Sequence, residues 1–371
     1  MRIGVPKEIK NNEYRVGLAP AAVYELVTAG HEVRVETGAG VGAGATDADY
    51  ERIGALVVSS AEEVWNSSEL IIKVKEPLES EYRFFREDLT IFTYLHLAAD
   101  EALTQKLLES GTTAIAYETV QMPDRSLPLL APMSAIAGRL ATQVAAYHLM
   151  APLGGAGVLM GGVPGTPAAK VLVIGGGVVG EQAAIIARGQ HAAVTVVDLD
   201  VKRLQQIDLV HNGTITTRYS TKLALEETIK DADVVIGSVL IPGAKAPKLV
   251  TNEMVSTMKK GAVLVDVAID QGGCFEGSHP TTHDNPTFRV HDTTFYCVAN
   301  MPGSVPVTAT AALNNATLPY VLKIAKLGWK DALAADPALA LGLHTHAGSL
   351  FNRGVGEALG IETKEISSLI G

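Results

Sequence analysis

The chain is poor in cysteine, in aromatic residues and in basic residues. Its 371 residues include two cysteines, and Phe, Trp and Tyr together make up 5%. Two cysteines exclude a disulfide framework, although they leave a single bridge open, and their scarcity fits a reducing, cytoplasmic location. Thirty Lys and Arg against forty Asp and Glu give a net charge of −10. A surface that binds the phosphates of nucleic acid is positively charged instead. We therefore expect no nucleic-acid partner.

Long uninterrupted apolar runs are also missing. The N-terminus, MRIGVPKEIK, lacks the apolar segment of a signal peptide. No charged residue lies between Arg139 and Lys170, but glycine pairs and prolines break this stretch, and Gln143 and His148 interrupt its apolar part. We interpret it as a buried helix followed by a glycine-rich connection, and expect no membrane partner.

Aliphatic residues and glycine are abundant instead. Hydrophobic residues make up 47% of the chain, and there are 36 glycines. Such a core is typical of parallel sheets covered by helices. Strands are predicted at 2–5, 32–36, 70–74, 89–95 and 113–118, and again at 170–175, 193–198, 233–239, 262–269 and 295–300. A helix is predicted from about 133 to 150, and the tail from Val305 is predicted to be largely helical, with its first helix interrupted at Pro319. The pattern predicts an α/β protein of two domains, each with a mainly parallel sheet.

One motif points to a nucleotide. Gly175, Gly177 and Gly180 stand in G-x-G-x-x-G register, after an apolar strand and before a helical pattern. The first glycine allows a sharp turn, the second lets the backbone approach a pyrophosphate, and the third lets helix and strand pack closely. The next predicted strand ends in Asp198, a position that suits the ribose 2′-hydroxyl of NAD and repels the 2′-phosphate of NADP. Lys202 and Arg203 follow closely, which leaves some tolerance of NADP open.

The alternative interpretation is a tight strand–helix turn with a capping Asp, and the complete strand–glycine–helix–strand–acid order favours the dinucleotide site.

Ser238, Val239 and Leu240 follow the next strand, and Asp270 follows the one after. Since ligands of open parallel sheets bind beyond the carboxyl ends of strands, these positions are expected to face the nicotinamide. For Asp270, an ordinary Asp turn remains an equal alternative.

Polar groups also follow strands in the first third of the chain. Arg15, Lys75 and His96 each come after a predicted strand. Together they would make an anion site with an acid/base group, set across a cleft from the nucleotide. Taken singly, Arg15 and Lys75 also fit solvated surface charges, and His96 fits a capping or core histidine.

Longer motifs carry a family resemblance. The chain resembles the alanine dehydrogenase family, which is related to the NAD-binding part of proton-translocating transhydrogenases. The resemblance covers nearly the whole chain and weakens beyond about residue 330. The motifs are IGVPKEIKNNEYRVGLAP, KVKEP, FTYLHLAAD, AYETV, RSLPLLAPMSAIAGR, LMGGVPG, VDVAIDQGGC and VANMPGSVPVTAT.

The resemblance implies reversible oxidative deamination of L-alanine by NAD to pyruvate and ammonium, by a homohexamer. It implies a substrate domain made of residues 1–130 and 305–371 around a central Rossmann domain of residues 131–304. Arg15 and Lys75 would hold the substrate carboxylate and carbonyl, His96 would be the proton donor and acceptor, and Asp270 the second acid/base group. The residues expected around NAD are Ser134, Gly175, Gly177, Val178, Val179, Gly180, Asp198, Arg203, Ser220, Val239, Leu240, Val267, Ala268, Ile269, Asp270, Val298, Ala299, Asn300 and Met301.

Two alternatives remain open at this point. A transhydrogenase component would carry an Arg-Gln-Asp loop where this chain has PDRSLPLL (123–130), and it would be membrane-associated. A non-catalytic NAD sensor would often have lost groups such as Arg15, Lys75, His96 and Asp270. No His, Cys, Asp or Glu cluster has metal-ligand spacing, so no metal is expected.

Overall fold

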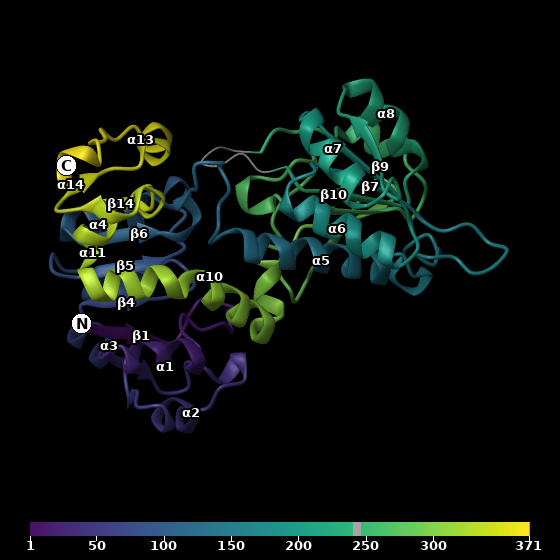
Figure 1. Cartoon of the computed structure of the whole chain (residues 1–371). Helices are drawn as coiled ribbons and strands as arrows, with labels where there is room; N and C mark the ends of the chain where they lie inside the picture. The colour runs from purple at the N-terminus through teal and green to yellow at the C-terminus, as the bar shows by residue number, and fades with distance from the viewer. Residues whose placement is uncertain (240–245, 371) are drawn as a thin grey trace. The chain divides into compact units, whose positions relative to one another are not determined.

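The computed structural model describes residues 1–239 and 246–370, and the chain divides into two compact units. Unit 1 consists of Met1–Met133 with Gly303–Gly371, and unit 2 of Ser134–Pro302 (Figure 1). The chain thus leaves unit 1, forms unit 2 and returns. Each unit contains a largely parallel sheet with helices around it, so the predicted α/β architecture is confirmed.

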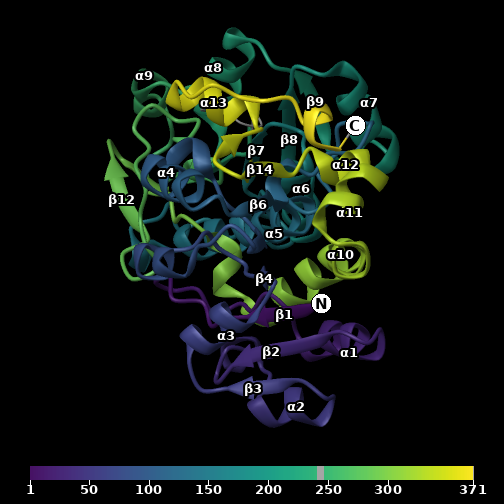
Figure 2. The same ribbon diagram turned by 90° about the vertical axis from the view of Figure 1, so that its left-hand side faces the viewer.

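Unit 1 is built on an eight-stranded sheet with the order β15-β14-β6-β5-β4-β1-β2-β3. In Figure 2 the labelled strands follow this order from β14, through β6, β4, β1 and β2, to β3 at the far edge. The first six strands along the chain pair in parallel, and β14 and β15 add antiparallel strands at the β6 edge. The strand order reverses between β1 and β4, which is where such sheets bind ligands. The strands are β1 (Arg2–Val5), β2 (Glu32–Glu36), β3 (Leu56–Val58), β4 (Leu70–Ile72), β5 (Thr90–Thr93), β6 (Thr113–Ala116), β14 (Leu343–His346) and β15 (Ser349–Leu350).

Helices surround this sheet. Side chains of α3, α4 and α13 share one hydrophobic cluster with Ile71, Ile91 and Ala114 of the strands. The helices and 3₁₀ turns are α1 (Pro20–Thr28), η1 (Val41–Ala43), α2 (Asp47–Arg52), α3 (Ala61–Ser67), η2 (Glu79–Phe84), η3 (Leu97–Ala99), α4 (Glu101–Ser110), η4 (Tyr117–Thr119), α10 (Pro306–Leu327), α11 (Trp329–Ala335), α12 (Pro337–Ala340), α13 (Arg353–Leu359) and α14 (Ser367–Ile370).

The C-terminal segment is largely helical, as predicted, and its two short strands, β14 and β15, extend the sheet. One expectation about it is wrong: its first helix is not interrupted, because α10 runs through Pro319. Leu313 and Val321 are buried on either side of the proline. Their packing outweighs the one backbone hydrogen bond that the proline nitrogen cannot make.

Unit 2 is built on a seven-stranded sheet with the order β12-β13-β11-β10-β7-β8-β9. Among the strands that the structure describes here, β12 at one edge pairs antiparallel and the others pair in parallel. The strand order reverses between β7 and β10. The strands are β7 (Lys170–Ile174), β8 (Ala193–Asp198), β9 (Thr216–Tyr219), β10 (Val234–Gly237), β11 (Val263–Asp266), β12 (Thr287–Val290) and β13 (Thr293–Tyr296).

Successive side chains of β7 point to opposite faces of the sheet, so the core of unit 2 has two layers. Val171 and Val173 pack with residues of α5 and α6, whereas Leu172 and Ile174 pack with residues of α8 and α9. No helix in the described ranges has the length and apolarity to cross a membrane. The helices and 3₁₀ turns are α5 (Ala131–His148), η5 (Ala151–Leu153), α6 (Val178–Gly189), α7 (Val201–Val210), α8 (Lys222–Asp231), α9 (Asn252–Ser256), η6 (Ile269–Gln271) and η7 (Met301–Ser304).

Candidate active site

The glycine turn of unit 2 joins β7 to α6. Gly175 has a φ of +99°, a conformation that suits glycine. A Cβ at Gly180 would lie 1.8 Å from the Gly175 carbonyl oxygen, so the third glycine is required by the close approach of helix and turn. A Cβ at Gly177 would meet nothing within 4 Å. The second glycine therefore leaves open space at the start of α6, which fits a pyrophosphate approaching the backbone.

Asp198 ends β8 and lies against this turn. Its Oδ2 accepts a hydrogen bond from the Gly176 N–H at 2.5 Å, and its Oδ1 accepts one from the Asp200 N–H at 2.8 Å. The Arg203 guanidinium donates to the Gly176 carbonyl and pairs with Glu181. The carboxylate is thus fixed beside the turn, and the charge of Arg203 is matched by an acid that the sequence did not single out.

The end of β10 is tied to the same turn. The Ser238 hydroxyl is buried and donates to the carbonyls of Ile174, at 2.8 Å, and Gly175, at 2.9 Å. Val239 follows and is partly buried. Leu240, which was also expected near NAD, lies outside the described residues.

Asp266, a residue that sequence reasoning missed, organises the loop after β11. It is 1% exposed and accepts hydrogen bonds from the N–H groups of Cys274 and Phe275 and from the Ser278 hydroxyl. Burial raises the pKa of Asp266, although these hydrogen bonds act to lower it. The same carboxylate accepts from the Ala268 N–H, so it fixes the loop that also carries Val267, Ile269 and Asp270.

Asp270 lies in η6 and is exposed. Within the described ranges its carboxylate has no hydrogen-bond or ion-pair partner, so it can act on a bound molecule.

The other residues expected near NAD are spread along unit 2. The Ser220 N–H donates to the Asp198 carbonyl at 2.9 Å, and Asn300 has a φ of +61°. Ser134 lies in α5, Val178 and Val179 in α6, Val298 and Ala299 between β13 and η7, and Met301 in η7.

In unit 1, Arg15 is almost fully buried, with 2% of its surface exposed. Its Nε donates to Oε1 of Glu13 at 2.6 Å, its Nη2 pairs with the other Glu13 oxygen, and its Nη1 lies 3.0 Å from the Met133 sulfur. Burial alone would lower the pKa of Arg15, but the Glu13 carboxylate raises it above its usual value. The guanidinium is therefore charged and oriented by Glu13, two residues before it in the sequence.

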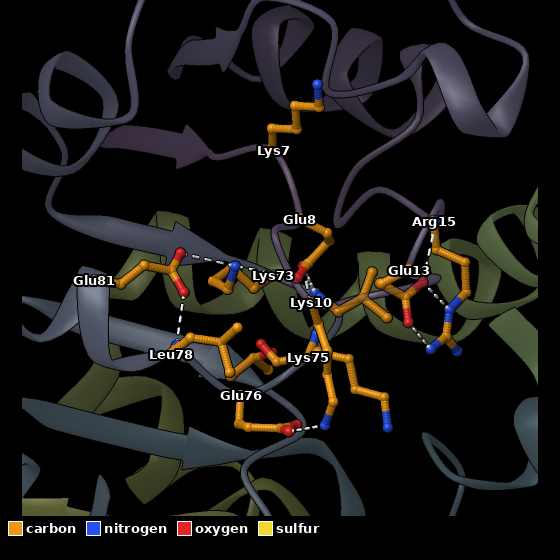
Figure 3. Close-up of polar contacts among 12 residues, drawn as sticks. Lys7, Glu8, Lys10, Glu13, Arg15, Lys73, Lys75, Glu76, Leu78 and Glu81 are labelled. Carbon is orange, nitrogen blue, oxygen red and sulfur yellow. Dashed lines mark hydrogen bonds and ion pairs between the residues drawn. The ribbon is translucent and has the colours of Figure 1, made fainter. Parts of the chain in front are cut away.

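Lys75 lies just beyond β4, which ends at Ile72 rather than at residue 74 as predicted. Its side chain is mostly buried, and its ammonium has no hydrogen-bond or ion-pair partner among the residues that the structure describes. The neighbouring Lys73, in contrast, is 1% exposed, and its Nζ lies 3.1 Å from Oε2 of Glu8 and 3.0 Å from Oε1 of Glu81 (Figure 3). Burial alone would lower the pKa of Lys73, but the two carboxylates raise it. Of these two lysines, only Lys75 is available to a ligand.

His96 follows β5 in the left-handed conformation, with a φ of +53°. Its N–H donates to Oε1 of Glu118 at 2.7 Å, and its Nδ1 lies 4.0 Å from the same oxygen. The imidazole stacks on Tyr94, and 43% of the side chain is exposed. A partly exposed imidazole beside a carboxylate can both accept and donate a proton.

Two residues connect the three candidates of unit 1. Burial acts to raise the pKa of Glu76, but Lys75, Lys10 and His96 lower it below its usual value. Tyr94, which stacks on His96, also interacts electrostatically with Arg15. Arg15, Lys75 and His96 therefore share one region at the carboxyl ends of the unit 1 strands, beside the reversal of strand order.

His344 of β14 is a buried neighbour of this region. Its Nε2 hydrogen-bonds the Thr119 hydroxyl at 3.0 Å, and its Nδ1 is buried without a partner among the described residues. Burial lowers the pKa of His344 to about 4. In the unfolded chain the His344 ring binds a proton below about pH 6.5, whereas the buried ring of the folded protein stays neutral down to about pH 4. The contribution of His344 to the stability of the fold is therefore complete above pH 6.5 and is lost as the pH falls toward 4.

We therefore expect wild-type protein to lose about 3 kcal/mol of unfolding free energy through His344 between pH 7 and pH 4. His344→Gln should lose that much less over the same range. Urea unfolding of both proteins across this pH range measures the difference. Identical pH dependences would contradict the prediction.

In the described part of the chain, no three His, Cys, Asp or Glu side chains gather in a way that could hold a metal ion. Unit 2 by itself presents a glycine turn with an acid beside it, and unit 1 by itself presents cationic and imidazole groups.

Comparison with known proteins identifies the family. The model described as "Alanine dehydrogenase/PNT, N-terminal domain" matches residues 4–137, and "Alanine dehydrogenase/PNT, C-terminal domain" matches residues 141–353. The chain is 58% identical over 370 residues to an alanine dehydrogenase of Mycobacterium tuberculosis, covering 100% of each. A solved L-alanine dehydrogenase is similar with a TM-score of 0.93 and 52% identity, over 97% of this chain and 99% of that one. A transhydrogenase structure from Sinorhizobium meliloti has a TM-score of 0.80 and 26% identity, over 95% and 99%. The chain therefore belongs to the alanine dehydrogenase/PNT family, as its motifs predicted.

Proposed function

We propose that this protein catalyses the reversible, NAD-dependent oxidative deamination of L-alanine to pyruvate and ammonium. The observation that carries the proposal is the likeness to alanine dehydrogenases over the full length of the chain. The charged Arg15, the Lys75 ammonium, which has no partner among the described residues, and the exposed His96 and Asp270 support the proposal, because each is a group that the reaction needs. A homohexamer in the cytoplasm is part of the same proposal.

Residues 131–304 would hold NAD. The open space at Gly177 accommodates the pyrophosphate at the N-terminus of α6, and the Asp198 carboxylate accepts hydrogen bonds from the ribose. The other residues expected near NAD would line the rest of its site. When bound, NAD supplies the acceptor for the hydride that leaves C2 of alanine. Glu181 matches the charge of Arg203, and the Asp198 carboxylate repels a 2′-phosphate, which together favour NAD over NADP.

Residues 1–130 and 305–371 would hold the amino acid. Arg15 can form two parallel hydrogen bonds with the substrate carboxylate, which a lysine cannot do. The Lys75 ammonium polarises the C2 oxygen or imine. His96 moves the protons when water adds to the imine and when the carbinolamine collapses to pyruvate and ammonia. The Asp270 carboxylate orients the water or amine and stabilises cationic intermediates.

Asp198→Ala tests the cofactor assignment. Loss of the carboxylate should raise the KM for NAD about tenfold, the effect of one lost charged hydrogen bond, and reduce the preference for NAD over NADP. Steady-state kinetics with both cofactors measure the change. Unaltered cofactor kinetics would refute the assignment to the ribose.

A spectrophotometric screen of amino acids with NAD, and with NADP as the control, tests the function as a whole. Alanine-dependent formation of NADH by this chain alone supports it. The likeness to a transhydrogenase structure makes an NAD-binding transhydrogenase component the second candidate. Binding of NADH without any amino-acid-dependent turnover would favour that candidate and overturn the first.

A further inference from the structure

The main chain that carries Lys75 depends on a side chain for one of its hydrogen-bond acceptors. β1 ends at Val5, and it pairs with β4 only as far as Ile71. The N–H groups of Val74 and Lys75 lie beyond that pairing. Oε1 of Glu8 accepts from the Val74 N–H at 2.6 Å and from the Lys75 N–H at 3.4 Å. The Glu8 carboxylate thus continues the ladder on the side of β4 where β1 has ended.

Glu8 is itself held by a buried ion cluster. Its other oxygen, Oε2, pairs with the Lys73 ammonium, which also pairs with Oε1 of Glu81. Oε2 of Glu81 accepts from the Leu78 N–H at 2.8 Å at the start of η2. Figure 3 shows Lys73 between the two carboxylates. A buried charge is costly unless it is paired, so neither glutamate can turn away from Lys73 without leaving the ammonium underpaired.

We propose that Glu8 is a positioning residue for the alanine site, fixing the main chain at Val74 and Lys75 and thereby the direction of the Lys75 side chain. The inference rests on the proposed function, in which the Lys75 ammonium polarises the C2 oxygen or imine. Glu8 and Lys73 act through Lys75 and do not contact the substrate in this scheme. A misplacement of a catalytic group by about 1 Å can lower a rate about 100-fold.

Glu8→Gln and Glu81→Gln form a matched pair that tests the proposal. Each glutamate accepts from Lys73 with one oxygen and from a backbone N–H with the other. A glutamine in either orientation must turn its NH₂ group toward one of these donors, and each variant removes one negative charge from Lys73. The two variants differ in the backbone that they disturb, which is that of Val74 and Lys75 for Glu8 and that of Leu78 for Glu81.

Thermal unfolding should show a similar decrease in Tm for both variants. For Glu8→Gln we expect kcat/KM for alanine and for pyruvate to fall tenfold or more, with the KM for NAD within twofold of wild type. Glu81→Gln should keep kcat/KM within threefold. If either protein does not fold, Glu8→Asp and Glu81→Asp, which keep the charge and shorten the reach, replace the pair with the same expectations.

Equal losses of kcat/KM in both members of a pair would show a merely structural role and overturn the proposal. Wild-type kinetics in the Glu8 variant would overturn it as well. Failure of the proposed function has a different signature, because wild-type protein would then not oxidise alanine at all.

Discussion

Replacing His96 with alanine is expected to lower kcat for alanine oxidation about 1,000-fold, the contribution of a well-placed general acid/base group. The proton transfers to and from the carbinolamine would then depend on water. NAD binding should remain at its wild-type strength, because the glycine turn and Asp198 belong to unit 2 and His96 belongs to unit 1. Stopped-flow or steady-state assays give kcat, and calorimetric titration with NAD gives the Kd.

A matched control is His191→Ala. His191 is also an exposed histidine in the left-handed conformation, with a φ of +66°, but it lies in the turn before β8, at the opposite end of that strand from Asp198. The backbone effect of the substitution is thus the same in both variants. The role of His96 in proton transfer would be refuted by a His96→Ala enzyme that turns over alanine like wild type.

The second large effect separates two glycines of one motif. Gly180→Ala should destabilise unit 2 by about 3 kcal/mol, because the new Cβ must be accommodated against a backbone oxygen that cannot move far. Gly177→Ala should fold normally, since its Cβ meets nothing within 4 Å. It should nevertheless raise the Kd for NAD about 10- to 100-fold, equal to about 1.4–2.8 kcal/mol, because the methyl group occupies space proposed for the pyrophosphate.

Thermal melts and NAD titrations of the two variants distinguish these effects. Gly189 offers a control. It is the last residue of α6, the helix that Gly177 caps, and a Cβ there also meets nothing within 4 Å. Gly189→Ala should alter neither stability nor the Kd by more than a small amount. Tight NAD binding by Gly177→Ala would mean that the cofactor does not approach the turn at this glycine.

Local patterns in the sequence predicted much of the fold. The glycine turn, the strand before it and the strand ending in Asp198 are consecutive in the chain, so spacing and alternation suffice to recognise them. Strand ends were less accurate. The segment 262–269 was predicted as one strand, but β11 stops at Asp266. The Asp266 carboxylate bonds the N–H of Ala268 and turns the chain, an effect of a buried aspartate that hydropathy does not indicate.

The partners of the candidate site residues were beyond sequence reasoning. Glu8 reaches Lys73 across 65 positions, and Glu118 reaches His96 across 22. Each contact depends on which strands become neighbours, and that order is a tertiary property. The motif KVKEP alone could not distinguish the buried Lys73 from Lys75 either, because alternation gives both the same face of the chain.

The position of β14 beside β6 has a consequence for the order in which the protein is made. β6 is complete when residue 116 has left the ribosome, but its outer edge stays unpaired until Leu343 and Thr345 follow. All of unit 2 is synthesised during that interval. The nascent N-terminal region therefore exposes an unpaired strand edge during this time, and strands of other chains can pair with such an edge. If translation stalled before β14, the edge of β6 would remain unpaired.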